Sequence, residues 1–181
     1  MTTAKRSLPL FCALSLVLVG GAAGCGVSVE ADLPEVEVTQ HDLAFDGVPQ
    51  AGLVGDVSET RSFSQQHKTL ELPKGLDSEV KALGVTMTAK TGVQDLAFLH
   101  NVRVLMTDDV HEPIELLDYQ QDATARPGSV LSMVSANPVN TLDQWKTSSA
   151  TFTVEVAGAL PPSDWTVDLA IDFSGKVKYS Y

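Results

Sequence analysis

The amino-acid sequence predicts an all-β protein in which two antiparallel sheets pack as a β-sandwich. Apolar and polar residues alternate along several segments, which is the pattern of strands with one buried face. Clusters of Gly, Pro, Asn and Asp separate these segments. About seven to nine short strands in a chain of this length favour two packed sheets around one core. A closed β-barrel is the alternative, because it uses the same strand pattern.

The two clearest strands lie near the end of the chain. One face of residues 165–173 is apolar and consists of Trp165, Val167, Leu169, Ile171 and Phe173. Residues 152–156 alternate in the same way. Pro161 and Pro162 lie between the two segments, and proline cannot donate to a ladder, so they mark a connection.

Two segments in the middle of the chain are expected to form a hairpin. Residues 85–89 alternate, and residues 96–107 form the second segment after a short polar stretch. Both faces of the second segment are largely apolar, apart from His100 on one of them. This composition predicts a central strand.

Weaker strand candidates are residues 36–45, 60–72, 114–119, 130–135 and 175–181. In the first of them the apolar phase shifts, which predicts a bulge or bend near Gln40. Residues 76–83 and 142–146 are possible helical turns instead. Both are shorter than the roughly 12 residues that a stable helix needs.

The first residues have the three parts of an export signal. Lys5 and Arg6 precede an apolar run over residues 8–19, and small residues follow up to Cys25. A membrane-spanning helix needs about 20 apolar residues. The run is therefore expected to be a signal and not an anchor.

Residues 22–25, Ala-Ala-Gly-Cys, resemble the lipobox of bacterial lipoproteins, although Ala22 stands where leucine is commonest in that family. The resemblance implies cleavage before Cys25, a diacylglycerol thioether on its sulfur, and a fatty acyl group such as palmitate. It predicts a signal peptide at residues 1–24, a lipidated tether at 25–34 and a single sandwich domain at 35–181. An ordinary secretory signal is the alternative.

Charge and cysteine content narrow the function further. The full chain has 12 basic and 23 acidic residues; removal of Lys5 and Arg6 with the signal leaves 10 against 23, a net charge of −13. Such a surface repels nucleic acid, so we expect no nucleic-acid partner. Cys12 would leave with the signal, so no intramolecular disulfide could form and the domain must rely on its apolar core.

Few residues suggest a metal site. Histidines occur at positions 41, 67, 100 and 111, without the close spacing of a zinc site. The most polar cluster contains Asp108, Asp109, His111 and Glu112, and its oxygens would suit a weak calcium site. A solvated turn between two strands explains the same residues, and we expect no cofactor.

Catalytic motifs of the common serine-hydrolase and nucleotide-binding types are absent from the sequence. Paired carboxylates leave no local signature. Asp168 and Asp172 share a predicted face, but a separation of about 13 Å at roughly 3.3 Å per residue exceeds that of glycosidase pairs. We therefore expect a solvated face and not a catalytic pair.

Aromatic residues are the remaining candidates for ligand contacts. Trp165 is expected in the core, and Trp145 is expected to plug one end of the sandwich, with a surface contact as the alternative. Tyr119, Tyr179 and Tyr181 complete the set.

Together these features predict a non-catalytic, lipid-anchored envelope protein that acts as a structural or interaction module. The lipoprotein resemblance implies the outer membrane if the cell has two membranes, because Gly26 replaces the aspartate associated with inner-membrane retention. A carbohydrate- or calcium-binding sandwich is the alternative, and a hydrolase with scattered carboxylates is a third hypothesis. The protein or glycan partner is not predicted.

Overall fold

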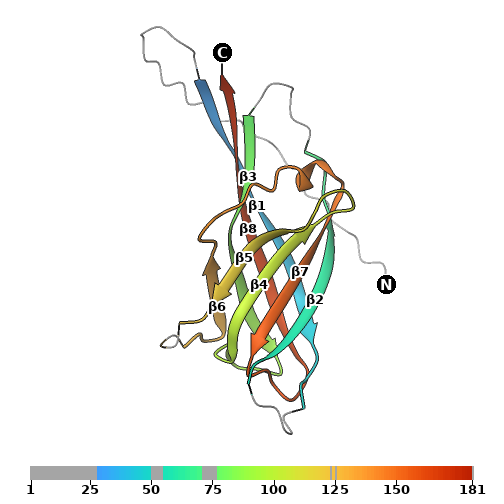
Figure 1. Cartoon of the computed structure of the whole chain (residues 1–181), viewed down its shortest axis with the longest axis vertical. Helices are drawn as coiled ribbons and strands as arrows, with labels where there is room; N and C mark the ends of the chain where they lie inside the picture. The colour runs from blue at the N-terminus through green and yellow to red at the C-terminus, as the bar shows by residue number, and fades with distance from the viewer. Residues whose placement is uncertain (1–27, 50–54, 71–76, 123, 125, 181) are drawn as a thin grey trace, which may run out of the picture.

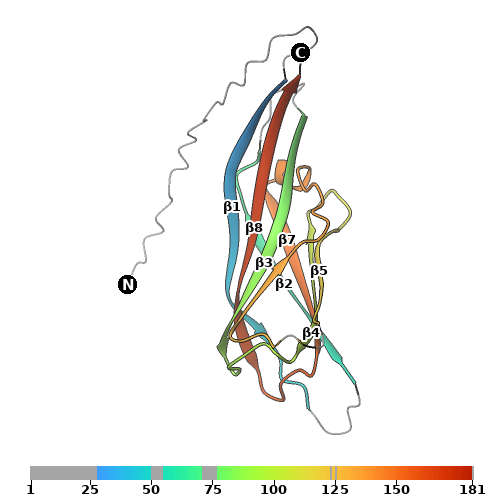
Figure 2. The same ribbon diagram turned by 90° about the vertical axis from the view of Figure 1, so that its left-hand side faces the viewer.

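A computed structural model describes residues 28–49, 55–70, 77–122, 124 and 126–180. It confirms the predicted β-sandwich, because the strands form two antiparallel four-stranded sheets that face each other (Figures 1 and 2). The described strands do not close into the barrel that the sequence pattern also allows.

Strands from both ends of the chain lie side by side in the first sheet. Its order is β1-β8-β3-β6, with the bounds Ser28–Phe45, Trp165–Ser180, Asp77–Thr91 and Val130–Val134. The order of the second sheet is β2-β7-β4-β5, with the bounds Val57–Gln66, Ser149–Gly158, Leu99–Thr107 and Ile114–Gln120. A short 3-10 turn, η1 (Gln144–Lys146), precedes β7.

The core lies between the sheets and follows the predicted alternation. Every second residue of β7 is buried along its whole length, and β4 lies inside its sheet as its apolar faces predict. Trp165 is fully buried, as expected, and stacks on Phe45 with ring centroids 4.4 Å apart. Such aromatic pairs add roughly 0.5–1.5 kcal/mol beyond the area that they bury.

The predicted hairpin between residues 85–89 and 96–107 is wrong. β3 and β4 belong to different sheets, so residues 92–98 cross from one sheet to the other. Leu96 in this crossing is fully buried, and its N–H donates to the Gly128 carbonyl at 3.0 Å. Burial of Leu96 in the core thus holds this connection between the two sheets.

The remaining local predictions have mixed outcomes. The register of β1 shifts between Gln40 and Leu43, which confirms the bulge, and Asp42 has a φ of 51° there. Residues 77–83 are part of β3 and not a helical turn, because they pair with β8. Residues 144–146 do form a turn, the 3-10 turn η1.

Two strands of the first sheet, β1 and β8, are longer than predicted. The segments 165–173 and 175–180 are one continuous strand, β8. β1 already begins at Ser28, so the boundary predicted between a tether at 25–34 and a domain at 35–181 is wrong over residues 28–34. These residues are a strand because they pair with the last part of β8, from Ser28 opposite Ser180 to Leu33 opposite Gly175.

Candidate functional site

The first sheet continues past the second sheet at one end of the sandwich (Figures 1 and 2). We call this part the strand extension; it consists of residues 28–33 of β1, 77–80 of β3 and 175–180 of β8, with β8 in the middle. Side chains in a strand alternate between its two faces. Val177 therefore points to the same side as the core residues of β8, whereas Lys176 and Lys178 point to the outer side.

Charged side chains form two rows across the outer side of the strand extension. Lys178 lies opposite Glu30 on β1 and Asp77 on β3, and Lys176 lies opposite Asp32 and Glu79. We call these six residues the charge ladder. Opposite charges that face each other across antiparallel strands add roughly 0.2–1 kcal/mol per pair. The ladder therefore favours the pairing of three segments that are far apart in the sequence.

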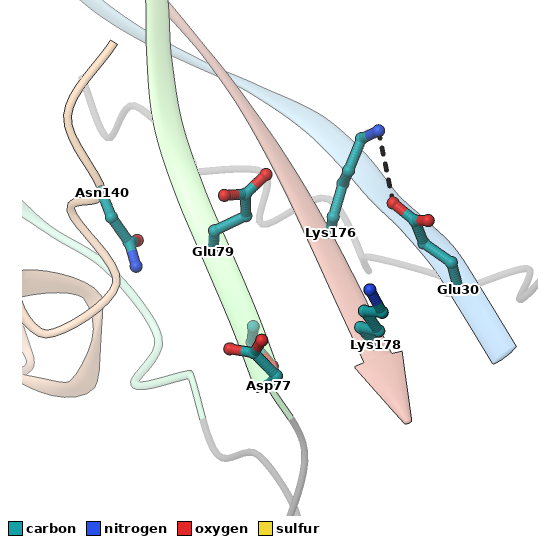
Figure 3. A pocket seen from close by; sticks show the side chains of 7 residues that line it. Glu30, Asp77, Glu79, Asn140, Lys176 and Lys178 are labelled. Carbon is teal, nitrogen blue, oxygen red and sulfur yellow. Dashed lines mark ion pairs between the residues drawn. The ribbon is translucent and has the colours of Figure 1, made fainter. Parts of the chain in front are cut away.

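The ladder also contains close ion pairs. Lys176 Nζ lies 3.4 Å from Glu30 Oε1, which is a diagonal contact (Figure 3). Glu79 Oε2 lies 2.6 Å from Lys81 Nζ on the same strand. The side chains of Lys176 and Glu30 are about half exposed, so water and salt screen this pair. The contribution of these contacts to stability is therefore small, and the charges remain accessible to a ligand.

One side of the ladder is closed by the segment before η1. The Asn140 carbonyl oxygen Oδ1 accepts a hydrogen bond from the Val80 N–H at 3.0 Å, and the Thr141 N–H donates to the Val80 carbonyl at 2.7 Å. This segment thus continues the edge of the sheet where β6 has ended. It is held in turn by Trp145, whose indole N–H donates to Thr141 Oγ1 at 3.2 Å.

A cavity of about 280 Å³ lies between this segment and the ladder. It is lined by Glu30, Asp77, Ser78, Glu79, Asn140, Lys176 and Lys178 (Figure 3). Ser78 Oγ is buried and has no hydrogen-bond partner among the described residues. Three carboxylates and two ammonium groups therefore surround a space large enough for a small polar group.

A glycine at the base of the strand extension permits close packing. A Cβ on Gly175 would lie 2.8 Å from Leu33 Cδ1 and 3.3 Å from the Glu79 carbonyl oxygen. Leu33 therefore lies directly over the backbone of β8. This contact keeps β1 against β8 where the second sheet no longer supports them.

The cavity suits the binding of a group that carries both signs of charge. The lysines can hold a phosphate or carboxylate, and the acids beside them can hold an amine. On the second sheet, by contrast, the outward-facing hydroxyls of β2 and β7 are already hydrogen-bonded to each other, with Ser62 Oγ and Ser64 Oγ each 2.9 Å from a threonine Oγ1 of β7. The described geometry therefore supports charge-based binding.

The calcium candidates lie in the connection between β4 and β5. The Asp108 side chain is shielded from solvent, and its carboxylate accepts hydrogen bonds from the N–H groups of Val110 and His111 and from His111 Nδ1, at 2.6–3.0 Å. Burial alone would raise the pKa of Asp108, but the bonds from His111 and Val110 outweigh it and hold the pKa at about 2. Donors thus occupy the oxygens that a cation would need.

Asp109 and Glu112 lie in the same connection and are exposed. Among the residues that the structure describes, no group of three or more His, Cys, Asp or Glu side chains is placed to hold a metal ion. The geometry of this cluster is that of a turn fastened by Asp108.

Other histidines also lie beside aspartates. His100 Nδ1 is 2.8 Å from Asp56 Oδ1, and His41 Nδ1 is 3.4 Å from Asp168 Oδ1. Asp168 accepts a hydrogen bond from the Asp42 N–H and forms an ion pair with Lys90, and both lower its pKa, the first more strongly. Asp168 is therefore part of the support for the β1 bulge.

The aromatic candidates for ligand contact belong mainly to the core. Trp145 is 8% exposed and meets Phe173 edge-on with centroids 5.1 Å apart, so it plugs the end of the sandwich as predicted. Tyr119 is half-buried beside the core. The side chain of Tyr179 and all of Tyr181 lie outside the described residues, as do the leader and Cys25.

The charge ladder is not among the sites predicted from the sequence, although a weak signal is present there. Charges recur every second residue at 30 and 32, at 77 and 79, and at 176 and 178, with the last pair opposite in sign to the others. This period places each pair on one face of a strand. The register that brings the three pairs together is not visible in the sequence.

Comparisons with known proteins add little. No protein-family model matches the chain, and no curated protein matches it. Among solved structures the chain is similar to one from "Structure of infectious bursal disease virus Gx strain", with 14% identity, a TM-score of 0.36 and coverage of 82% of this chain and 38% of that chain. A likeness this distant carries no argument. Within the described part of the chain, no helix combines the length and hydropathy of a membrane span.

Proposed function

We propose that the protein is a non-catalytic envelope lipoprotein, in which lipid on Cys25 holds a rigid acidic β-sandwich at a membrane as a structural or interaction module. The outer membrane is the proposed location in a cell with two membranes. The support is the export signal that ends in Ala-Ala-Gly-Cys at residues 22–25.

The structure adds that β1 starts at Ser28, only three residues after Cys25. An acyl group on Cys25 would be coupled almost directly to a strand that pairs with β8 along its length. Both ends of β1 are fastened in this way, since Phe45 lies opposite Trp165. The fold thus offers a firm attachment for a lipid at this position.

The non-catalytic part of the proposal rests on how the reactive groups are used. The clearest His–Asp contacts fasten turns and strand ends, as Asp108 does with His111. The charged groups of the strand extension form ion pairs across exposed strands. Such contacts stabilise the fold or can bind a ligand. They support recognition of a partner as the proposed role of the surface.

Substitution of Cys25 tests the anchor directly. Cys25→Ser removes the acylated thiol, so the protein should move from the membrane fraction to the soluble fraction or remain as an uncleaved precursor. Cys12→Ser is the matched control, because Cys12 lies in the signal and should leave the location unchanged. Mass spectrometry of the native N-terminus should show an acylated Cys25. A native chain that starts elsewhere, or with an unmodified thiol, would refute the proposed function.

A further inference from the structure

We infer that the strand extension is the membrane-contacting end of the molecule, where its mixed-charge face meets zwitterionic phospholipid headgroups. This inference rests on the proposed anchor at Cys25. It adds which end of the sandwich faces the lipid, and which lipid chemistry that end accepts.

Only a short stretch of chain connects the anchor to the fold. Ser28 comes three residues after Cys25, and at about 3.6 Å per residue this stretch spans at most roughly 11 Å in any conformation. The headgroup layer on one side of a bilayer is roughly 5–8 Å thick. Ser28 must therefore lie in this layer or directly on it when Cys25 is acylated.

The three strands of the extension are paired with one another near Ser28. Ser28 lies opposite Ser180 on β8, and Asp77 on β3 lies opposite Lys178 close by. Three paired strands thus end together at the tip of the strand extension (Figure 2). The opposite end of the same strands, where Phe45 lies opposite Trp165, is about 50 Å away at roughly 3.3 Å per residue.

The surface that would meet the lipid carries both signs of charge. The cavity combines two lysines with three acids, on a chain whose overall charge is −11. A zwitterionic headgroup supplies a phosphate for Lys176 and Lys178 and a positively charged ammonium group for Glu30, Asp77 and Glu79. An anionic headgroup without a cationic group would satisfy the lysines but be repelled by the acids.

The orientation can be measured on the full lipidated protein. Single cysteines are introduced as Ser28→Cys at the tip, Thr39→Cys midway along β1 and Ser163→Cys at the opposite end, and each is labelled with a fluorophore. The proteins are reconstituted in phosphatidylcholine vesicles that contain a lipid with a nitroxide on its headgroup. Contact with the headgroups quenches the fluorophore.

Quenching should be several-fold stronger at position 28 than at position 163, with position 39 between them. Equal quenching at 28 and 163 on vesicle-bound protein would overturn the orientation while leaving the anchor intact. Protein that does not bind the vesicles at all, although Cys25 is present, would overturn both the anchor and this inference.

The lipid chemistry is tested with the same label at position 28. Replacing phosphatidylcholine by phosphatidylglycerol should weaken the quenching, because the acids of the charge ladder then face phosphates without the positive charge of choline. A double variant, Lys176→Gln with Lys178→Gln, should weaken quenching in phosphatidylcholine, whereas the matched control Lys68→Gln with Lys90→Gln should not. Equal or stronger quenching in phosphatidylglycerol, or equal effects of the two double variants, would overturn the headgroup assignment.

Discussion

At the scale of single residues, the structure uses its shielded carboxylate to fasten a turn. Asp108 collects two backbone N–H donors and the ring of His111, and this set of bonds keeps the pKa of its carboxyl at about 2. Hydrogen bonds to a charged group contribute roughly 1.5–3 kcal/mol each, and loss of the acceptor leaves buried donors unsatisfied. The connection between β4 and β5 therefore depends on this side chain.

Asp108→Asn should lower the free energy of unfolding by about 1–3 kcal/mol at pH 7, because the charge-assisted bonds are weakened. Urea denaturation followed by circular dichroism measures the difference. Asp109→Asn is the matched control, because the Asp109 side chain is next in the sequence and is exposed. This substitution should change stability by less than about 0.5 kcal/mol. Equal stability of both variants and the parent protein would contradict the role of Asp108.

The same residue predicts a dependence on pH. The pKa of Asp108 is lowered on folding from 3.8 to about 2, so its stabilising contribution is fully present above pH 3.8 and is lost as the pH falls toward 2. The difference in stability between the parent and Asp108→Asn should therefore shrink over this window. A difference that stays constant from pH 6 to about pH 2 would show that the carboxylate charge is not responsible.

At the scale of elements, glycines fix where the chain changes sheets. Gly92 begins the crossing from β3 toward β4 with a φ of 78°, and a Cβ there would lie 2.3 Å from the Asp164 carbonyl oxygen. Both the backbone conformation and the space exclude larger residues. Close contact between this crossing and the start of β8 is thus built into the chain.

Gly92→Ala should destabilise the protein by about 1–3 kcal/mol or more, since strain and steric overlap act together. Gly55→Ala separates the two effects, because Gly55 also has a positive φ of 107° but has no atom within 4 Å of the place that a Cβ would take. It should cost only about 1 kcal/mol. Thermal unfolding of both variants tests this order, and a larger loss for Gly55→Ala would contradict it.

Sequence patterns predict the strands that bury one face and fail where pairing partners decide. Residues 152–156 and 165–173 are recognisable because their alternation is complete. Residues 77–83 have apolar positions that also fit a helical turn, and only the pairing with β8 makes them a strand. Residues 30–33 resemble a tether in sequence because neither face is fully buried, so their period is masked by mixed composition.

The candidate site escapes sequence-based prediction for the same reason. The sequence shows three short charged repeats, but they come together as one site only through the register of strands that are more than 40 residues apart. The calcium candidates, by contrast, are adjacent in sequence and stand out for that reason. Acids that are adjacent in sequence, such as Asp108 and Asp109, need not form a cation site in the folded chain, because hydrogen-bond donors occupy the Asp108 carboxylate.

At the scale of the whole molecule, the fold depends on contacts between distant segments. β1 pairs with β8, the first described strand with the last, and β2 pairs with β7. Such pairings require closure of long loops before any interaction is gained, which slows folding. The chain must nearly be complete before its first sheet can form.

Refolding from urea should therefore take milliseconds to seconds, as in other sandwiches dominated by distant pairings. Stopped-flow tryptophan fluorescence is a suitable measurement, because Trp165 and Trp145 are both buried in the native state. Complete refolding in tens of microseconds would contradict the expected dependence on long-range pairing.

The antiparallel pairing of β1 with β8 also bears on mechanics. A pull on Cys25 would act along the axis of β1 and would load its hydrogen bonds to β8 in parallel, from Ser28 to Phe45. Bonds loaded together share the force, whereas bonds at the end of a peeling hairpin fail one after another. If Cys25 is acylated as proposed, a module held at its distal end would thus resist unravelling under a pull on its lipid, and extraction of the acyl chains would be the easier failure.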